Sequence, residues 1–405
     1  MRGLFKRLTE WIVHIPDVFR KADTEEDEFG TRLRKHKRVT YIRTTLFVVF
    51  LIAVIFLIRY AFIHWKFKSY KVIESEEVYD SVSEYREVNG KILRYSPDGA
   101  VLMKSNMKEE LWNESFNLTQ PVVETSGSVI GIYDKRGTEI HVYNTEGKLG
   151  DFVTNSPILF ARVSESGNVA AAVEDGQGTE IVYYTSAGEE IAAISPSAVK
   201  YGYPVSVSVS ERGDMLAVSY ITADNGVIGS RLAFYNFGSA GADKEDHLVA
   251  SEDFAGTLIP EIRYFGGSKL IAFTDNGFIV YKGSTPKKRE TVQFDDEIVS
   301  LFYDESRLAF VFRCDEVAHR YTMNVYRHSG KLIKSEYVDI IYDKGHFSGK
   351  EIIFCNSNEM AVYTHNGNLR FNGALNEGIL SDVIKTGINR YFVVSDTTAE
   401  LIKLR

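Results

Sequence analysis

The sequence predicts an all-β fold, a β-propeller of eight blades, preceded by one transmembrane α-helix and a short cytoplasmic arm. Three observations predict it. Residues 44–63 carry no charge except Arg59. After residue 68, short runs of Val, Ile, Phe and Tyr alternate with Gly, Asn, Asp and Ser turns, which is typical of short antiparallel strands. One strand motif also recurs about every 40–50 residues, the period of four-stranded propeller blades.

The apolar stretch is long enough to cross a membrane. Twenty helical residues at 1.5 Å each span roughly 30 Å, the thickness of the hydrocarbon core. A buried core helix seldom runs this long without a polar face. A cleaved signal peptide would end in small residues, whereas bulky residues follow Arg59 as far as Trp65. We therefore predict an uncleaved signal anchor over residues 44–65, with its membrane-embedded part marked by Thr44, Leu51, Ile58 and Ile63.

The basic flanks of this stretch predict its orientation. Six basic residues precede it, namely Arg32, Arg34, Lys35, Lys37, Arg38 and Arg43. Three follow it, Lys66, Lys68 and Lys71, before the sequence turns acidic. Because the more basic flank usually stays in the cytoplasm, we expect a single-pass protein of the cell membrane with its C-terminal domain outside.

The arm, residues 1–43, has apolar residues at helical spacing between Leu4 and Phe19, and Pro16 should end or kink that helix. Two interpretations stay open. The arm is either an amphipathic helix lying on the inner leaflet or a basic tail that only sets topology. It is too short to hold a cytoplasmic enzyme.

Charge and cysteine content narrow the class of protein. The formal net charge is −8 for the whole chain and −15 for residues 69–405. So acidic an outer domain argues against nucleic-acid binding, which needs a basic surface. The two cysteines, Cys314 and Cys355, exclude a disulfide-dense fold, favour a bacterial envelope, and leave open whether they pair.

The repeated strand has an apolar residue, a variable one, a second apolar one, and then Tyr before a turn. It occurs six times, with the tyrosines at Tyr143, Tyr184, Tyr235, Tyr281, Tyr326 and Tyr363. Their separations are 41, 51, 46, 45 and 37 residues. We interpret these tyrosines as core residues of successive blades. A β-sandwich has no such period, and the coils of a β-solenoid are shorter.

Two degenerate units flank the six, which makes eight blades our prediction and seven the alternative. In the first unit Met103 takes the tyrosine position. The last unit, residues 388–405, stops after its third strand. Because a propeller closes its ring by borrowing the missing strand from the other terminus, we predict that residues 71–79 pair beside 399–404 and that the propeller spans 71–405.

The segments ILRYSPDG and ELWN, together with the repeated [IL]-x-V-Y-x-x-x-G strands, resemble a family of uncharacterised bacterial single-pass membrane proteins. The resemblance covers nearly the whole chain. It implies an extracytoplasmic, quinoprotein-like or WD40-like propeller domain of unknown function. It implies no activity and no functional residues.

The sequence offers no pattern for catalysis, cofactor binding or metal binding. The nine histidines show no ligand spacing such as H-x-H or H-E-x-x-H. Paired carboxylates such as Glu174-Asp175 occupy turns, where solvated Asp and Glu are ordinary. A quinoprotein dehydrogenase would need a cofactor-stacking Trp, and Trp112 is better explained by packing between blades. We therefore predict no catalytic, cofactor-binding or metal-binding residue.

The longest loops occur between residues 220 and 256 and stretch one repeat to 51 residues. Insertions in repeat proteins often mark the binding face, although a tolerated surface insertion would look the same. The residues of interest are Asp224, Asn225, Asp243, Lys244 and Asp246. The leading hypothesis is a non-enzymatic platform that binds an envelope protein or a cell-wall ligand. The alternatives are a hydrolase or lyase with a site in the central channel, and a signalling anchor whose arm binds a cytoplasmic partner.

Overall fold

The computed structural model describes residues 28–77, 82–106, 108–176, 178–194, 202–224, 226–314, 316, 318–375 and 378–405. The predicted helix between Leu4 and Phe19 lies outside these residues. The chain divides into two compact units, Met1–Ile63 and His64–Arg405. We describe each unit by itself.

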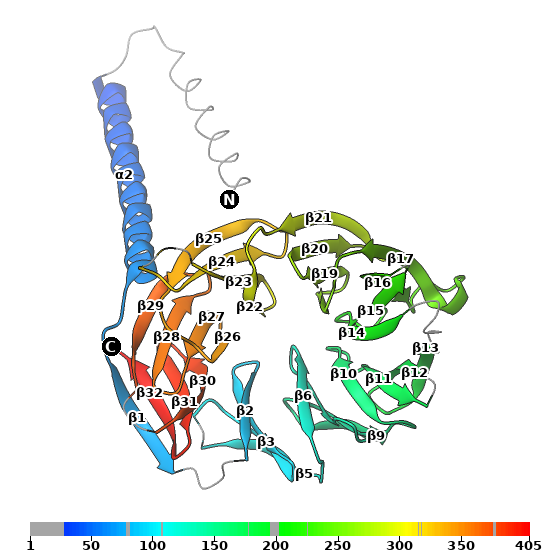
Figure 1. Cartoon of the computed structure of the whole chain (residues 1–405). Helices are drawn as coiled ribbons and strands as arrows, with labels where there is room; N and C mark the ends of the chain where they lie inside the picture. Colours follow the sequence, from blue (N-terminus) through cyan, green and yellow to red (C-terminus); the bar gives the residue numbers. More distant parts are fainter. Residues whose placement is uncertain are drawn as a thin grey trace. The chain divides into compact units, whose positions relative to one another are not determined.

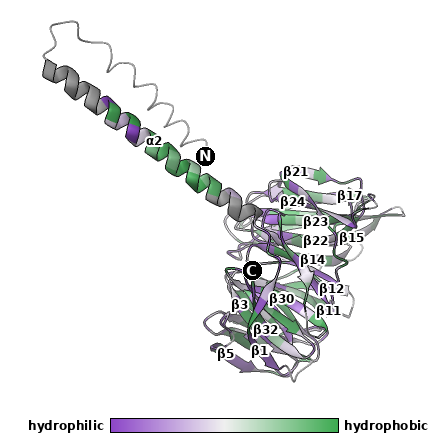
Figure 2. Ribbon diagram, turned by 90° about the vertical axis from the view of Figure 1, so that its left-hand side faces the viewer, coloured by the Kyte–Doolittle hydropathy of each residue, from purple (hydrophilic) through white to green (hydrophobic). Residues whose placement is uncertain are grey.

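The described part of the first unit belongs to one helix, α2 (Glu28–His64, 37 residues). Residues Arg38–Leu57 within it are long and apolar enough to cross a membrane. Figure 2 shows most of this stretch in the green of hydrophobic residues. The helix begins well before the predicted boundary at residue 44. Lys and Arg have nearly the same helix propensity as Leu, so the helix also includes the basic flank that precedes the apolar run.

The described residues of the second unit form eight four-stranded antiparallel sheets. In seven sheets the four strands follow one another in the sequence. These are blade 1, β2–β5 (Glu84–Val88, Lys91–Ser96, Gly99–Met103, Glu110–Ser115); blade 2, β6–β9 (Pro121–Ser126, Val129–Asp134, Glu139–Asn144, Lys148–Val153); blade 3, β10–β13 (Ile158–Val163, Val169–Asp175, Gly178–Tyr184, Glu190–Ile194); blade 4, β14–β17 (Tyr203–Val209, Met215–Asp224, Val227–Asn236, Leu248–Ala255); blade 5, β18–β21 (Glu261–Phe265, Lys269–Thr274, Gly277–Lys282, Lys287–Gln293); blade 6, β22–β25 (Ile298–Tyr303, Arg307–Arg313, Tyr321–Arg327, Leu332–Val338); and blade 7, β26–β29 (Lys344–Ser348, Glu351–Cys355, Glu359–Thr364, Leu369–Ala374).

Blade 8 closes the ring with strands from both ends of the unit. It contains β30 (Leu380–Gly387), β31 (Arg390–Ser395), β32 (Thr398–Leu404) and, as its fourth strand, β1 (Tyr70–Glu77). β1 runs antiparallel to β32, from the pair Tyr70–Leu404 to the pair Glu77–Thr398. In Figure 1 the blue β1 lies beside the red β32. The prediction of eight blades is confirmed, and so is the predicted closure over residues 71–77; residues 78 and 79 of the predicted strand lie outside the described residues.

The strands of each blade are antiparallel, so the turns that join them lie alternately at two ends of the blade. One end carries the turn between the first and second strands and the turn between the third and fourth strands. We call this end the entry end. The chain enters the ring at this end, where Tyr70 pairs with Leu404. The first strand of each blade lies nearest the centre of the ring (Figure 1).

The repeated tyrosine marks a β-bulge. In six blades the third strand shifts its pairing with the fourth strand at the tyrosine itself, as between Val142 and Tyr143 or between Val280 and Tyr281. Met103 of blade 1 occupies the same shift. A bulge increases local twist, so the motif recurs where each outer strand bends around its blade.

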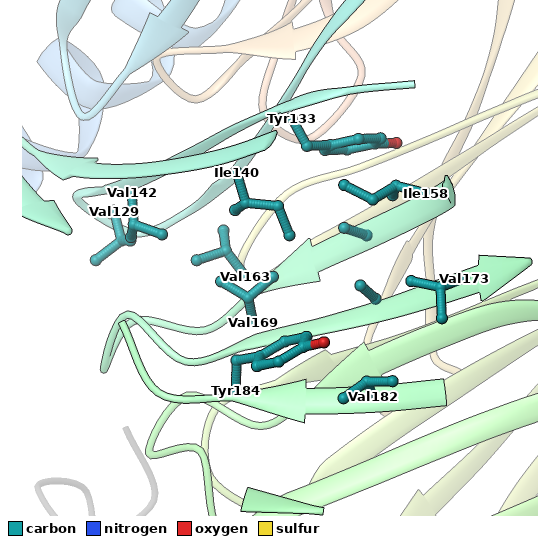
Figure 3. Close-up of a cluster of buried hydrophobic side chains, with 12 residues drawn as sticks. Val129, Tyr133, Ile140, Val142, Ile158, Val163, Val169, Val173, Val182 and Tyr184 are labelled. Carbon is teal, nitrogen blue, oxygen red and sulfur yellow. The ribbon is translucent and has the colours of Figure 1, made fainter. Parts of the chain in front are cut away.

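The core lies between blades. One cluster joins Val129, Tyr133 and Val142 of blade 2 to Val163 and Tyr184 of blade 3, and Figure 3 shows these side chains facing one another across the two sheets. The same arrangement recurs around the ring. Both faces of a blade are buried in this way, which explains why the second strands read as apolar runs without alternation.

His328, in the turn after β24, predicts how stability depends on pH. It is 4 % exposed, and burial, with a smaller contribution from Lys269, lowers its pKa from 6.5 to about 4. The unfolded chain therefore binds a proton at a pH where the folded ring does not. We expect the free energy of unfolding to fall as the pH is lowered from about 6.5 to about 4, by roughly 2–3 kcal/mol, and to be insensitive to this group above pH 7. Urea unfolding of wild type and His328→Gln at several pH values tests this, because the slope should become shallower in the variant.

Candidate binding face and central channel

Charged side chains of the inner strands meet in the centre of the ring. Arg162 of β10 forms an ion pair with Glu124 of β6 in the neighbouring blade. Arg263 of β18 reaches the same carboxylate, with Nη1 3.7 Å from Glu124 Oε2, and donates from Nη2 to the carbonyl of Thr125 at 2.8 Å. Blades 2 and 5 are separated by two other blades, so Arg263 crosses the channel. These contacts span the channel at this level.

The network extends to blade 6. The Tyr303 hydroxyl donates to Glu261 Oε1 at 2.5 Å, and burial raises the pKa of Tyr303 above its ordinary value. Glu124, Arg162 and Arg263 are each about one-fifth exposed. Two arginines share one carboxylate here, so the pairing holds the inner strands of three blades together.

Glu124 is the acceptor on which both arginines depend, which gives a test of the channel network. We expect Glu124→Ala to lower the free energy of unfolding by about 1–3 kcal/mol, because it removes the carboxylate that two largely buried cations share. Urea unfolding would measure the loss. A double-mutant cycle with Arg263→Ala should give a coupling of at least about 0.5 kcal/mol. Additive effects would show that the contact across the channel contributes nothing.

Three glutamates lie above this network at the entry end. Glu165, Glu211 and Glu305 occupy the turns after the inner strands of blades 3, 4 and 6, and they line one cavity together with Arg162 and Arg263. Its volume is about 20 Å³, room for one water molecule. Burial raises the pKa of Glu165, and the neighbouring carboxyl of Glu211 raises it further by repulsion and by a shared hydrogen bond. Burial also raises the pKa of Glu305.

The predicted loop residues do not form one face. Asp243, Lys244 and Asp246 are exposed and lie in the connection between β16 and β17, at the entry end. Asp224 ends β15 and pairs with Val227, at the opposite end of the same blade. Asn225 lies outside the described residues. The prediction missed this separation because a strand of ten residues lies between the two loops.

The turn after β16 contacts the neighbouring blade 5 at the entry end. The Asn236 side chain donates from Nδ2 to the carbonyl of Ser284 in blade 5, at 3.1 Å. Asp243, Glu245 and Asp246 therefore lie on the outer rim of the end that also carries Glu165, Glu211 and Glu305. We call these six carboxylates the acidic rim.

The marker tyrosines are buried in the ring. The exposed fractions of Tyr143, Tyr184, Tyr235, Tyr281, Tyr326 and Tyr363 lie between 1 % and 8 %. Trp112 stacks on Tyr143 with ring centroids 4.9 Å apart and donates to the carbonyl of Asn144 at 2.9 Å, so it packs between blades 1 and 2.

The remaining predicted residues fall in two places. Thr44 and Leu51 belong to α2, where the Thr44 hydroxyl donates to the carbonyl of Thr40 at 2.8 Å. Ile58 and Ile63 also belong to that helix. Cys314 and Cys355 lie in blades 6 and 7 and are not bonded to each other.

One Ser–His–Asp grouping lies at the entry end, in blades 6 and 7. His365 Nε2 is 2.5 Å from Asp304 Oδ2 and 3.5 Å from Ser306 Oγ. A hydrolase triad needs one ring nitrogen on the carboxylate and the other on the serine. Here one nitrogen faces both groups, so the contact joins two blades and does not activate the serine. Among the described residues, no group of three His, Cys, Asp or Glu side chains is placed to hold a metal ion.

A family model described as a family of unknown function (DUF5711) matches residues 63–404. The chain belongs to this family. The matched range covers the whole ring. No curated protein matches the sequence.

Solved structures resemble this member of the family in fold. A structure titled as the eukaryotic initiation factor is 13 % identical, covers 84 % of this chain and 88 % of its own, and has a TM-score of 0.51. BamB from Moraxella catarrhalis is 11 % identical, covers 83 % and 100 %, and has a TM-score of 0.47. Sqt1 from Saccharomyces cerevisiae is 9 % identical, covers 84 % and 99 %, and has a TM-score of 0.49. At these identities the likeness shows the fold alone.

Proposed function

We propose that this protein is a single-pass membrane protein whose propeller, outside the cytoplasm, binds another envelope protein or a cell-wall ligand without transforming it. The observation that carries the proposal is the different arrangement of charged side chains inside the ring and at its entry end. The inner charged side chains pair with one another across the channel, whereas the acidic rim leaves six carboxylates at one end. The ring therefore offers a surface for recognition and little internal space for a substrate.

The acidic rim favours a partner with Lys or Arg side chains. Its outer members, Asp243, Glu245 and Asp246, are exposed and form none of the ion pairs found among the described residues. An array of like charges steers an oppositely charged partner and selects its orientation more than it adds affinity. We expect the complex to weaken with salt, since exposed charges are screened within about 8 Å at physiological ionic strength.

The helix supports the membrane part of the proposal. Residues Arg38–Leu57 are long and apolar enough to cross a membrane, and more basic residues precede the apolar run than follow it. By the positive-inside tendency, this charge asymmetry supports a topology with residues 1–43 in the cytoplasm and the ring on the other side.

The test is cross-linking followed by affinity capture from detergent-solubilised membranes, with the full chain as bait. Wild type is compared with a rim variant, Asp243→Asn/Glu245→Gln/Asp246→Asn. The matched control neutralises three exposed acids at the opposite end, Asp295→Asn/Asp296→Asn/Glu297→Gln. We expect a cross-linked partner that is lost from the rim variant and kept by the control. An identical set of partners from all three chains would refute binding through the rim.

The alternative, a hydrolase or lyase at the channel, has one observation in its favour. Glu165 and Glu211 share a hydrogen bond at the channel mouth with the pKa of Glu165 raised, as in acid–base carboxylate pairs. The cavity beside them, about 20 Å³, is too small to enclose a sugar or a peptide, which argues against this alternative. Release of soluble fragments from isolated cell walls by wild type, but not by Glu165→Gln/Glu211→Gln, would establish the enzyme.

A further inference from the structure

Three cations lie side by side where the chain enters the ring. Lys71 of β1 pairs directly with Lys403 of β32, and Lys403 pairs directly with Arg390 of β31. Directly opposed residues of antiparallel strands share one face of the sheet. All three side chains are exposed, and among the described residues no carboxylate forms an ion pair with any of them. We call Lys71, Lys403 and Arg390 the cation ladder.

Like charges placed directly opposite each other destabilise a sheet. The rest of this acidic domain balances many of its exposed cations, as where Lys104 pairs with Glu109 at 2.5 Å and Lys148 with Asp151 at 2.9 Å. Even Glu74, on the same strand as Lys71, pairs with Lys108 of blade 1 instead. The ladder therefore keeps three neighbouring positive charges that only an outside anion can neutralise.

Apolar side chains accompany the ladder at the entry end. Ile388, in the turn between β30 and β31, is 80 % exposed and lies two residues before Arg390. Trp65 is 60 % exposed and lies five residues before β1. Trp, aliphatic and basic side chains together are the composition of surfaces that rest in the headgroup layer of a membrane. A soluble anion would explain the ladder and leave Ile388 unexplained.

We propose that the cation ladder binds the phosphates of anionic lipid headgroups, with Ile388 reaching the headgroup–acyl boundary beside it. The proposal rests on the membrane anchoring proposed above. The chain itself supports a lipid ligand, since only five residues, 65–69, separate the end of α2 from β1. Because blades 8 and 4 stand on opposite sides of an eight-bladed ring, contact at blade 8 leaves the blade 4 part of the acidic rim free for a partner.

The experiment places a bimane fluorophore at residue 388, as Ile388→Cys in a Cys314→Ser background, on the full chain in nanodiscs. Quenching by lipids labelled in the acyl chain reports contact with the membrane. We expect at least twofold stronger quenching in discs with one-third phosphatidylglycerol than in discs of phosphatidylcholine alone, and loss of the difference in 1 M salt (roughly a 3 Å screening length).

The ladder variant is Lys71→Gln/Arg390→Gln/Lys403→Gln, and its matched control is Lys135→Gln/Arg313→Gln/Arg320→Gln at the opposite end. We expect the ladder variant to show equal quenching in both discs and the control to behave as wild type. In neutral discs the ladder variant should unfold at the same or a higher temperature than wild type, because a repulsion has been removed. If the three ladder residues were instead needed for the fold, the ladder variant would unfold at a lower temperature than wild type.

Two results would overturn the proposal. One is equal quenching of wild type in anionic and neutral discs. The other is protection of the ladder from lysine-modifying reagents by soluble polyphosphate with no approach to anionic discs, which would assign the site to a soluble polyanion. A chain that fails to enter discs at all refutes the anchoring instead, and sedimentation of that chain with phosphatidylglycerol vesicles then tests the ladder alone.

Discussion

A chain in which residues 70–77 are replaced by a Gly-Ser linker of equal length is expected to lose its closed ring. Among the described residues, β1 is the one strand paired with the outer edge of β32, from Tyr70 to Glu77. Its loss uncovers the β32 edge and loosens Ile402 and Leu404, which are now 0 % and 1 % exposed. We expect a loss of at least about 5 kcal/mol, comparable to the whole stability of many domains, and a broad transition in thermal unfolding.

The matched control replaces another fourth strand, β13 (Glu190–Ile194), with a linker of its own length. β13 is also an outer strand. All four strands of its blade follow one another in the sequence, so β13 does not close the ring. We expect a smaller loss with a single transition retained. Equal losses from the two replacements would show that β1 acts as an ordinary edge strand and that ring closure adds no stability.

Removal of Glu351 is the second large effect that we expect. Glu351 is 3 % exposed at the interface of blades 7 and 8, with Arg370 Nη1 at 2.7 Å and Lys385 Nζ at 2.6 Å. The Tyr391 hydroxyl donates to the same carboxylate at 2.5 Å, and burial followed by this carboxylate raises the pKa of Tyr391. Glu351→Ala would leave two buried cations without their anion. We expect a loss of about 3–5 kcal/mol in urea unfolding.

An exposed pair supplies the comparison for Glu351. Glu109 pairs with Lys104 at 2.5 Å, and both side chains are about half exposed. Glu109→Ala should cost far less than Glu351→Ala, because an ion pair between exposed side chains contributes little to stability. A result for Glu351→Ala no larger than this would mean that water reaches the cluster in the folded protein. The triple change Glu351→Leu/Arg370→Met/Lys385→Met should recover much of the loss, since an apolar replacement leaves no buried charge.

The fold could be predicted because its signals are local and repeat. The Tyr143 strand and its five copies each carry the pattern of a strand and a turn, so their spacing alone gives a blade period. The closing strand followed from one further fact, that the last unit ends after its third strand. What the pattern could not show was why the tyrosine recurs, because a bulge depends on pairing with the fourth strand.

The channel and the cation ladder could not be predicted from spacing. Glu124 and Arg263 are 139 residues apart and meet only because the ring brings blades 2 and 5 across the channel from each other. Lys71 and Lys403 are far apart in the sequence, and only the register of β1 on β32 shows that they are neighbours. Spacing also gave no signal that Glu165 and Glu211, which follow the inner strands of blades 3 and 4, would meet at the mouth of the channel, since their meeting depends on the packing between blades.

The most direct test of the account is labelling of single cysteines in intact cells with a reagent that does not cross membranes. In a Cys314→Ser background, with Cys355 only 2 % exposed, a cysteine at Ile388 reports on the ring and a cysteine at Thr24 reports on the N-terminal arm. We predict that residue 388 is labelled in intact cells and that residue 24 is labelled only after the membrane is opened. The reverse pattern, or labelling of both residues only after lysis, would contradict a membrane protein that presents its propeller outside the cytoplasm.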